Sequence, residues 1–223
     1  MKLSQEKLEF LKTSNISNVL IEWGNKNYRD FPWRYTFNPY TVAISELLLR
    51  RTKACLITEA YKNITGKCRD MCCISASGED YIINAVAHLG ITNRSDLIIR
   101  ASSYICQNYG GIIPVLRELL ERIPGFGDYT ISAIRVFGYN KNDPLIDVNT
   151  VRILARLSGL EISDSLRRTD EIHFIYSVVL GNADPVKFGY AMLDLGAIIC
   201  SSIPKCSQCP LSLICSYSNT SQK

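Results

Sequence analysis

Apolar side chains recur along this chain at intervals of three and four residues, the spacing that places them on one face of an α-helix. Between residues 38 and 49 this face contains Val42, Leu47 and Leu48, and Asn38-Pro39 is typical of a helix start. Further stretches with helical spacing lie at 53–64, 79–88, 95–108, 114–122, 129–138, 148–158, 166–180 and 185–199. No segment alternates apolar and polar residues between Gly or Asn turns, as paired strands do. The pattern therefore predicts an all-α protein.

The length and composition are those of an ordinary globular protein. The 223 residues can bury a core as one domain or two, and there is no repeat, low-complexity tract or long linker. A net charge of +4 permits binding to nucleic acid without requiring it. The longest apolar runs, such as 112–116, are too short to span a membrane, and the N-terminus starts an amphipathic helix rather than an apolar signal. We expect a cytoplasmic monomer with no membrane partner.

A glycine-rich turn, Gly125-Phe126-Gly127, separates two of the predicted helices. Glycines allow a positive φ and close backbone approach, and the amides that open the next helix form an anion site at the positive end of its dipole. A simple helix–helix connection would show the same glycines. The Tyr129-Thr130 that follows makes the pattern more specific and favours a phosphate anchor.

Two aspartates accompany this turn. Asp128 can cap the second helix, but it adds negative charge beside the proposed phosphate. Asp147 stands alone before the helix at 148–158, where its simplest role is an N-cap. Cleavage of a sugar–base bond needs a fixed negative charge beside an oxocarbenium-like sugar, and a helix N-terminus favours the charged carboxylate. Capping and catalysis are therefore compatible at Asp147.

Glu46 lies within an apolar stretch and is followed by Arg50 and Arg51. A solvated helix glutamate is one interpretation, but an apolar setting raises the pKa of a carboxylic acid and suits acid–base chemistry. The two arginines are either surface charges or contacts to DNA phosphates and to the gap left by an extruded base.

Four of the nine cysteines fall within sixteen residues, as Cys200-x5-Cys206-x2-Cys209-x5-Cys215. A zinc site usually has two closely spaced pairs, whereas one pair between two equal gaps favours a loop around a [4Fe–4S] cluster. Zinc and coincidental thiols remain the alternatives. We interpret the other five as buried thiols and both histidines as structural: Cys55, Cys68, Cys72, Cys73, Cys106, His88 and His173.

Together these motifs resemble the helix–hairpin–helix DNA glycosylase superfamily, which includes endonuclease III and the adenine mismatch glycosylases. The likeness covers nearly the whole chain, at 31–34, 38–40, 45–47, the hairpin, 147–149, 192–197 and the cysteine motif. Phe-Pro-Trp-Arg, Glu-x-Leu-Leu-Arg-Arg-Thr and Gly-x-Gly-x-Tyr-Thr most resemble the thymine–DNA mismatch glycosylases.

The resemblance implies two helical domains flanking a DNA-binding cleft. One is a six-helix barrel over 31–141 that carries the helix–hairpin–helix motif. The other joins 1–30 to 142–223 and carries the [4Fe–4S] cluster.

The resemblance also implies the partner and the site residues. Double-stranded DNA containing a mismatch would be bound through Gly125, Gly127, Thr130, Arg50 and Arg51. Asp147 falls on the catalytic aspartate, and Asn149 helps to orient it. The cysteines of the motif fall on the cluster ligands.

Tyr129 decides the reaction type within this family. Bifunctional members have a lysine there, whose amine forms a Schiff base with the sugar, and a tyrosine cannot form one. The sequence predicts a monofunctional glycosylase that removes thymine or uracil opposite guanine, with Glu46 positioning water or bonding the pyrimidine. The alternatives are an adenine glycosylase, which the lack of a module for reading 8-oxoguanine disfavours, and a non-catalytic DNA-binding protein.

Overall fold

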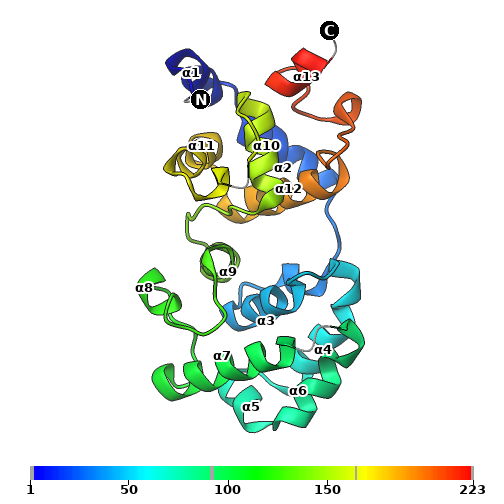
Figure 1. Ribbon diagram of the computed structural model, residues 1–223, viewed down its shortest axis with the longest axis vertical. Coiled ribbons are helices and arrows are strands. Elements are labelled where there is room, and N and C mark those ends of the chain that lie inside the picture. Colours follow the sequence, from blue (N-terminus) through cyan, green and yellow to red (C-terminus); the bar gives the residue numbers. More distant parts are fainter. Residues whose placement is uncertain (1–2, 91–92, 164, 222–223) are drawn as a thin grey trace. The chain divides into compact units, whose positions relative to one another are not determined.

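The computed structural model describes residues 3–90, 93–163 and 165–221. In this part of the chain the regular secondary structure is helical and no strand is present, which confirms the all-α prediction (Figure 1). The chain divides into two compact units. Unit 1 combines Met1–Arg29 with Pro144–Lys223, and unit 2 is Asp30–Asp143.

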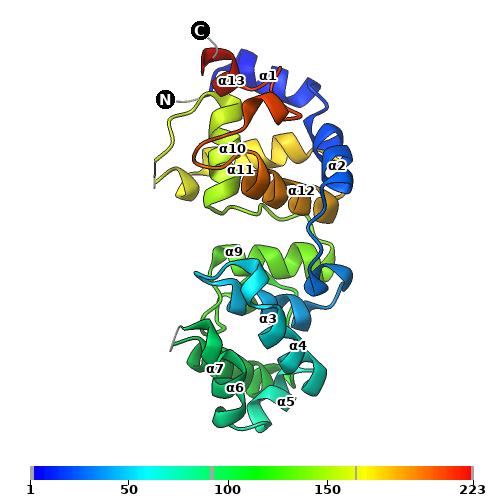
Figure 2. The ribbon, with the colours of Figure 1, turned by 90° about the vertical axis from the view of Figure 1, so that its right-hand side faces the viewer.

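Unit 2 is built around α3 (Pro39–Leu49), whose residues from Val42 to Leu48 are all buried. Asn38 caps this helix, since its Oδ1 accepts the Tyr40 amide at 2.9 Å. Its other helices are η1 (Pro32–Tyr35), η2 (Ala54–Leu56), α4 (Thr58–Lys67), α5 (Met71–Ala76), α6 (Glu79–Val86), η3 (Ala87–Leu89), α7 (Asn93–Tyr109), α8 (Arg117–Leu120), α9 (Asp128–Ala133) and η4 (Ile134–Gly138). Helices α4, α7, α9 and η4 pack against α3 (Figure 2). This packing joins the hairpin segment to the centre of the unit.

Unit 1 assembles from both ends of the chain. It contains α1 (Gln5–Thr13), α2 (Ile16–Lys26), α10 (Val148–Ser158), η5 (Leu166–Arg168), α11 (Asp170–Leu180), α12 (Pro185–Ile198), η6 (Cys206–Gln208) and α13 (Ser216–Ser221). The N-terminal α2 lies directly against α12 (Figures 1 and 2). A Cβ on Gly24 would lie 2.7 Å from that of Ala191, so this contact requires a glycine. At the end of the same helix pair, Arg29 Nε bonds the fully buried Asp194 at 2.5 Å.

Several helices differ from those predicted by periodicity. The stretch expected at 53–64 is a short 3-10 turn followed by α4, and only Arg117–Leu120 is α-helical within 114–122. The stretch at 129–138 is one helical run from Asp128 whose second half, η4, is a π-helix. Helix α5 was not predicted, because six residues are too short for a clear period.

The cysteines outside the C-terminal motif also differ from the prediction of buried thiols. Cys68 is paired with Cys73 and Cys72 with Cys106, at Cα separations of 5.3 and 4.8 Å. Cys55 is a free thiol, but it is exposed. The pairs arise because the short α5 brings adjacent cysteines against the end of α4 and the side of α7, an arrangement that spacing along the chain does not reveal.

No helix of the described residues is both long and apolar enough to cross a membrane.

Candidate active site and DNA-contacting residues

Asp147 is the N-cap of α10, as its position before an apolar helix predicted. Its Oδ1 accepts the amides of Asn149 at 3.0 Å and Thr150 at 2.7 Å. The Thr150 hydroxyl in turn accepts the Asp147 amide at 2.8 Å, which completes a capping box. The carboxylate is therefore fixed in a single orientation while remaining half-buried rather than enclosed.

Asn149 provides the other fixed contact to this carboxylate. Its side-chain amide donates to Asp147 Oδ2 at 2.8 Å, and its carbonyl oxygen accepts from Arg152 Nη2 at 2.7 Å. Arg152 also bonds the carbonyl oxygens of Cys200 at 2.7 Å and Gly196 at 3.1 Å. A continuous chain of hydrogen bonds thus runs from Asp147 to the start of the cysteine loop.

Arg152 was not among the sequence candidates. The signal that could have found it is its place three residues after Asn149, on the same face of a predicted helix. Gly196 enables the arrangement, because a Cβ there would lie 2.7 Å from that of Asn149.

The hairpin turn in unit 2 has the predicted positive φ at one glycine only. Gly125 has φ +84°, and a Cβ there would lie 3.0 Å from Leu97 Cδ2 of α7. Gly127 has φ −96° and is the N-cap of α9. The turn therefore uses the positive φ that glycine allows at Gly125 but not at Gly127, where extended backbone leads directly into the helix.

Asp128 is the first residue of α9 and not its cap, so the predicted capping role is wrong. Its carboxylate points outward, with 95% of the side chain exposed, and lies 3.9 Å from Arg117 Nη1. A carboxylate in the first turn interacts favourably with the helix dipole. Arg117 offsets part of its charge.

An ion-pair network around the buried Asp143 carboxylate stabilises the segments that flank the hairpin. Asp143, only 6% exposed, accepts hydrogen bonds from Arg117 Nη2 at 2.7 Å, Arg135 Nε at 2.5 Å and the Ser132 hydroxyl at 2.8 Å. These contacts tie α8, α9 and η4 to the residue that precedes unit 1. Asp143 was not among the residues predicted from the sequence, because a lone aspartate in a loop carries no pattern of its own.

Of the two predicted arginines, Arg50 lies beside this hairpin, and Arg51 follows it in the chain. Arg50 is half-buried, and its Nη2 lies 3.8 Å from the place a Cβ would take on Gly127. Arg51 is exposed and has φ +54°, which is uncommon for a residue other than glycine. Unit 2 therefore brings the hairpin and a cationic loop together.

The remaining unit 2 candidates differ in exposure. Glu46 is 8% exposed, so it is not a solvated helix glutamate. Thr130 is 5% exposed and Tyr129 is half-buried. Thr130 therefore offers little exposed side chain to a phosphate.

Two of the four cysteines of the C-terminal motif, Cys200 and Cys215, contact Arg156 of α10. Its Nη1 lies 3.3 Å from Cys200 Sγ and donates to the Ser201 carbonyl at 2.6 Å, and its own carbonyl accepts from Cys215 Sγ at 3.4 Å. Burial, and after it the charges of Cys215 and Cys200, raises the pKa of Cys206. The thiols are therefore near enough to interact electrostatically. Within the described ranges, however, no three His, Cys, Asp or Glu side chains are arranged to hold a metal ion.

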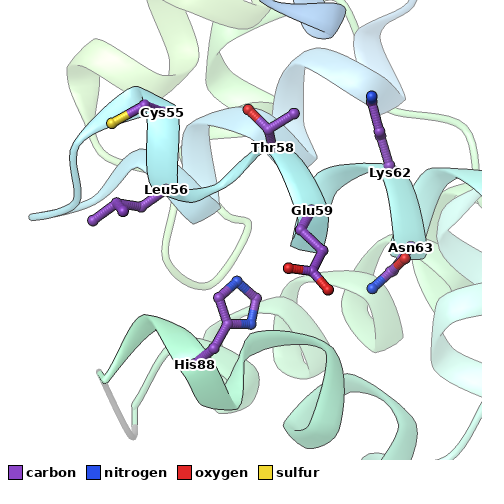
Figure 3. A pocket seen from close by; sticks show the side chains of 7 residues that line it. All are labelled: Cys55, Leu56, Thr58, Glu59, Lys62, Asn63 and His88. Carbon is purple, nitrogen blue, oxygen red and sulfur yellow. The ribbon is translucent and has the colours of Figure 1, made fainter.

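A separate pocket of about 560 Å³ lies in unit 2, between η2, α4 and η3. It is lined by Cys55, Leu56, Thr58, Glu59, Lys62, Asn63 and His88. The Glu59 carboxylate points toward the His88 ring (Figure 3). None of the predicted site residues lines this pocket.

The comparisons with known proteins identify the family. No family model matches the chain. A thymine-DNA glycosylase from Aeropyrum pernix is 33% identical over 209 residues, which cover 90% of this chain and 92% of that protein. The chain belongs to the thymine-DNA glycosylase family. A thymine/uracil-DNA glycosylase from Methanothermobacter thermautotrophicus is 29% identical over 91% of this chain and 92% of its own.

Solved structures agree with this assignment. The fold of a thermostable thymine-DNA glycosylase matches with a TM-score of 0.85 at 27% identity, over 94% of this chain and 97% of that one. An endonuclease III in a trapped covalent complex with DNA matches with a TM-score of 0.78 at 17% identity, over 99% of this chain and 100% of that one, which shows that the two share a fold.

Adenine DNA glycosylases are also similar, but over a smaller part of their length. One from Buchnera aphidicola is 31% identical over 89% of this chain, which spans 58% of that protein. The thymine-DNA and thymine/uracil-DNA glycosylases instead match over about nine-tenths of their length. The protein is accordingly a DNA glycosylase, a hydrolase of the N-glycosidic bond.

Proposed function

We propose that this protein removes thymine or uracil mispaired with guanine in duplex DNA and leaves the sugar–phosphate strand intact. The observation that carries the proposal is the fixed Asp147 carboxylate in a chain that matches thymine-DNA and thymine/uracil-DNA glycosylases over nearly their full length. The protein acts as a monomer. Its target is a mismatch, because a mispaired base costs less free energy to unstack and rotate out of the helix than a paired one.

Asp147 stabilises the reacting sugar. As the bond between C1′ and N1 of the pyrimidine breaks, its electron pair leaves with the base and positive charge develops on the sugar ring. A carboxylate held by two amides and the Asn149 side chain needs no reorientation to face that charge. Water then adds to C1′, and the proton it loses ends on the departed base or in solvent.

Unit 2 supplies the groups that hold DNA. The turn at Gly125 and Gly127 presents the first amides of α9 to a backbone phosphate. Arg50 and Arg51 contact neighbouring phosphates and support the opened stack. Glu46, buried on α3, positions the water or bonds the extruded pyrimidine.

Tyr129 makes the reaction hydrolytic. A phenol cannot form an imine with the sugar, so no covalent intermediate leads to strand cleavage. The half-buried ring of Tyr129 instead lines the pocket that receives the extruded base.

The C-terminal loop holds a [4Fe–4S] cluster through Cys200, Cys206, Cys209 and Cys215. The chemistry of the donor set fits this group, because all four candidate ligands are thiols within one sixteen-residue segment and Arg156 lies 3.3 Å from one of the sulfurs, where its charge complements a thiolate cluster. The thiols would have to draw together to hold it, since no three of them are arranged around a metal ion in the described residues. When bound, the cluster cross-links the loop and supplies no reacting group to the hydrolysis.

The experiment is a single-turnover assay on a duplex with one G·T pair. We expect free thymine to be released, with strand breaks appearing only after alkali treatment. Strand breaks that form without alkali would contradict the hydrolytic mechanism. Failure to release thymine would contradict the proposed G·T substrate.

A further inference from the structure

A buried arginine lies between the two DNA-contacting segments of unit 2. Arg94, the second residue of α7, is 2% exposed. Its Nη2 donates to the Arg50 carbonyl at 2.6 Å and to the Thr52 hydroxyl at 2.5 Å. One turn further along α7, Leu97 packs against Gly125 of the hairpin. The beginning of α7 therefore touches both the arginine loop and the phosphate-binding turn.

This is an unfavourable place for an arginine. A cation in the first turn of a helix is repelled by the positive end of its dipole. Burial lowers the pKa of the guanidinium, and Nη1 is buried without a hydrogen-bond partner. An apolar side chain of similar length would avoid all three costs. Residues that break local rules in this way concentrate at functional sites.

The loop that Arg94 holds is itself strained. Arg51 is in the left-handed region at φ +54°, which an L side chain rarely adopts, and the turn is closed by the Thr52 amide bonding the Leu49 carbonyl at 3.1 Å. Arg94 binds the carbonyl before Arg51 and the side chain after it. The clamp thus spans the strained residue from both sides.

We propose that Arg94 is a positioning residue that fixes residues 50–52 against the hairpin, so that Arg50 and Arg51 meet DNA as one preformed cationic surface with the hairpin amides. The inference rests on the proposed role of these arginines in DNA binding. Arg94 itself is buried and contacts no phosphate, so its effect on binding passes entirely through the loop.

The salt dependence of binding tests this directly. Each protein–phosphate contact adds about 0.9 to the slope of log affinity against log salt concentration. We expect Arg94→Met to reduce the slope for a G·T duplex by about 1 to 2, because Arg50 and Arg51 lose their positions. Affinity at low salt should fall at least about tenfold, and Arg94→Lys should retain part of the affinity that Arg94→Met loses.

The matched control is Arg100→Met on the same helix. The Arg100 side chain is 57% exposed and pairs with Asp96. This substitution should leave the slope unchanged.

A combination of variants separates positioning from general destabilisation. If Arg94 acts through the loop, Arg94→Met should add nothing further in an Arg50→Met/Arg51→Met background. An additive loss, or a wild-type slope with only a lower melting temperature, would overturn the proposal. Should Arg94→Met fail to fold, Thr52→Val decides, since it removes one acceptor of the clamp at a half-buried position. A lower slope supports the proposal and an unchanged slope contradicts it.

The binding measurement needs no base release. A wild-type protein that binds DNA but releases no pyrimidine would contradict the proposed function and leave the role of Arg94 to be decided by the slope.

Discussion

The side-chain amide of Asn149 donates a hydrogen bond to Oδ2 of Asp147 at 2.8 Å, while Oδ1 of the same carboxylate accepts two backbone amides. Both oxygens are therefore engaged within the first turn of α10, and the charged group that the chemistry needs is also the cap that starts the helix. A substitution that keeps the cap but removes the charge therefore separates the effect on catalysis from the effect on stability.

Asp147→Asn should abolish activity with little change in stability. Asparagine caps a helix about as well as aspartate but carries no charge to stabilise the sugar cation. We expect the single-turnover rate to fall by at least about 100-fold and the melting temperature to change by no more than about 3 °C. Asp147→Ala is the companion variant, which should lose both activity and the cap. If Asp147→Asn retains the wild-type rate, the catalytic assignment is wrong.

Asn149→Ala should slow the reaction through Asp147. The carboxylate loses one of its fixed contacts and Arg152 loses an acceptor, so the maximal rate should fall about tenfold while the KM stays near that of the wild type. Val148→Ala is the control, because this neighbour is 63% exposed and only its backbone carbonyl, which the substitution keeps, contacts the network through Arg152. Equal rates for Asn149→Ala and Val148→Ala would show that Asp147 needs no support from Asn149.

Tyr129 should be the residue that prevents strand cleavage. We expect borohydride to trap no adduct between the wild-type protein and a G·T duplex, whereas Tyr129→Lys should give a trapped adduct because a primary amine can form an imine with the sugar. Tyr129→Phe is the control that keeps the ring and should trap nothing. A wild-type adduct would contradict the hydrolytic mechanism.

The cysteine loop should bind iron. Purified protein should contain about four iron atoms per chain and absorb broadly in the visible range. Cys206→Ser should lose most of this iron, while Cys55→Ser, at an exposed thiol outside the loop, should keep it. A colourless wild-type protein that contains zinc would identify the alternative metal.

Helices with a clear cap and a long apolar face were predicted well from the sequence. Asn38 before α3 and Asp147 before α10 define those starts through local contacts that the residues themselves supply. By contrast, α5 and the pairing of Cys72 with Cys106 depend on packing between segments 34 residues apart. Local periodicity carries no information about such contacts.

The same division applies to the candidate site. Residue types and spacing were enough to name Asp147 and the cysteine motif as candidates. The burial of Glu46, the network at Asp143 and the clamp from Arg94 each arise from side chains that meet only in three dimensions. Arg94 in particular lies one residue before the helix predicted at 95–108, so periodicity left it in a loop.

Base release from three otherwise identical duplexes, which carry G·T, G·U or A·8-oxoguanine, tests the proposed substrate directly. We expect release of thymine and uracil from the first two and no release of adenine from the third, with the activity lost in Asp147→Asn. Release of adenine alone would contradict the proposed substrate and would place the protein with the adenine glycosylases in function, despite its similarity to the thymine-DNA glycosylases over about nine-tenths of their length.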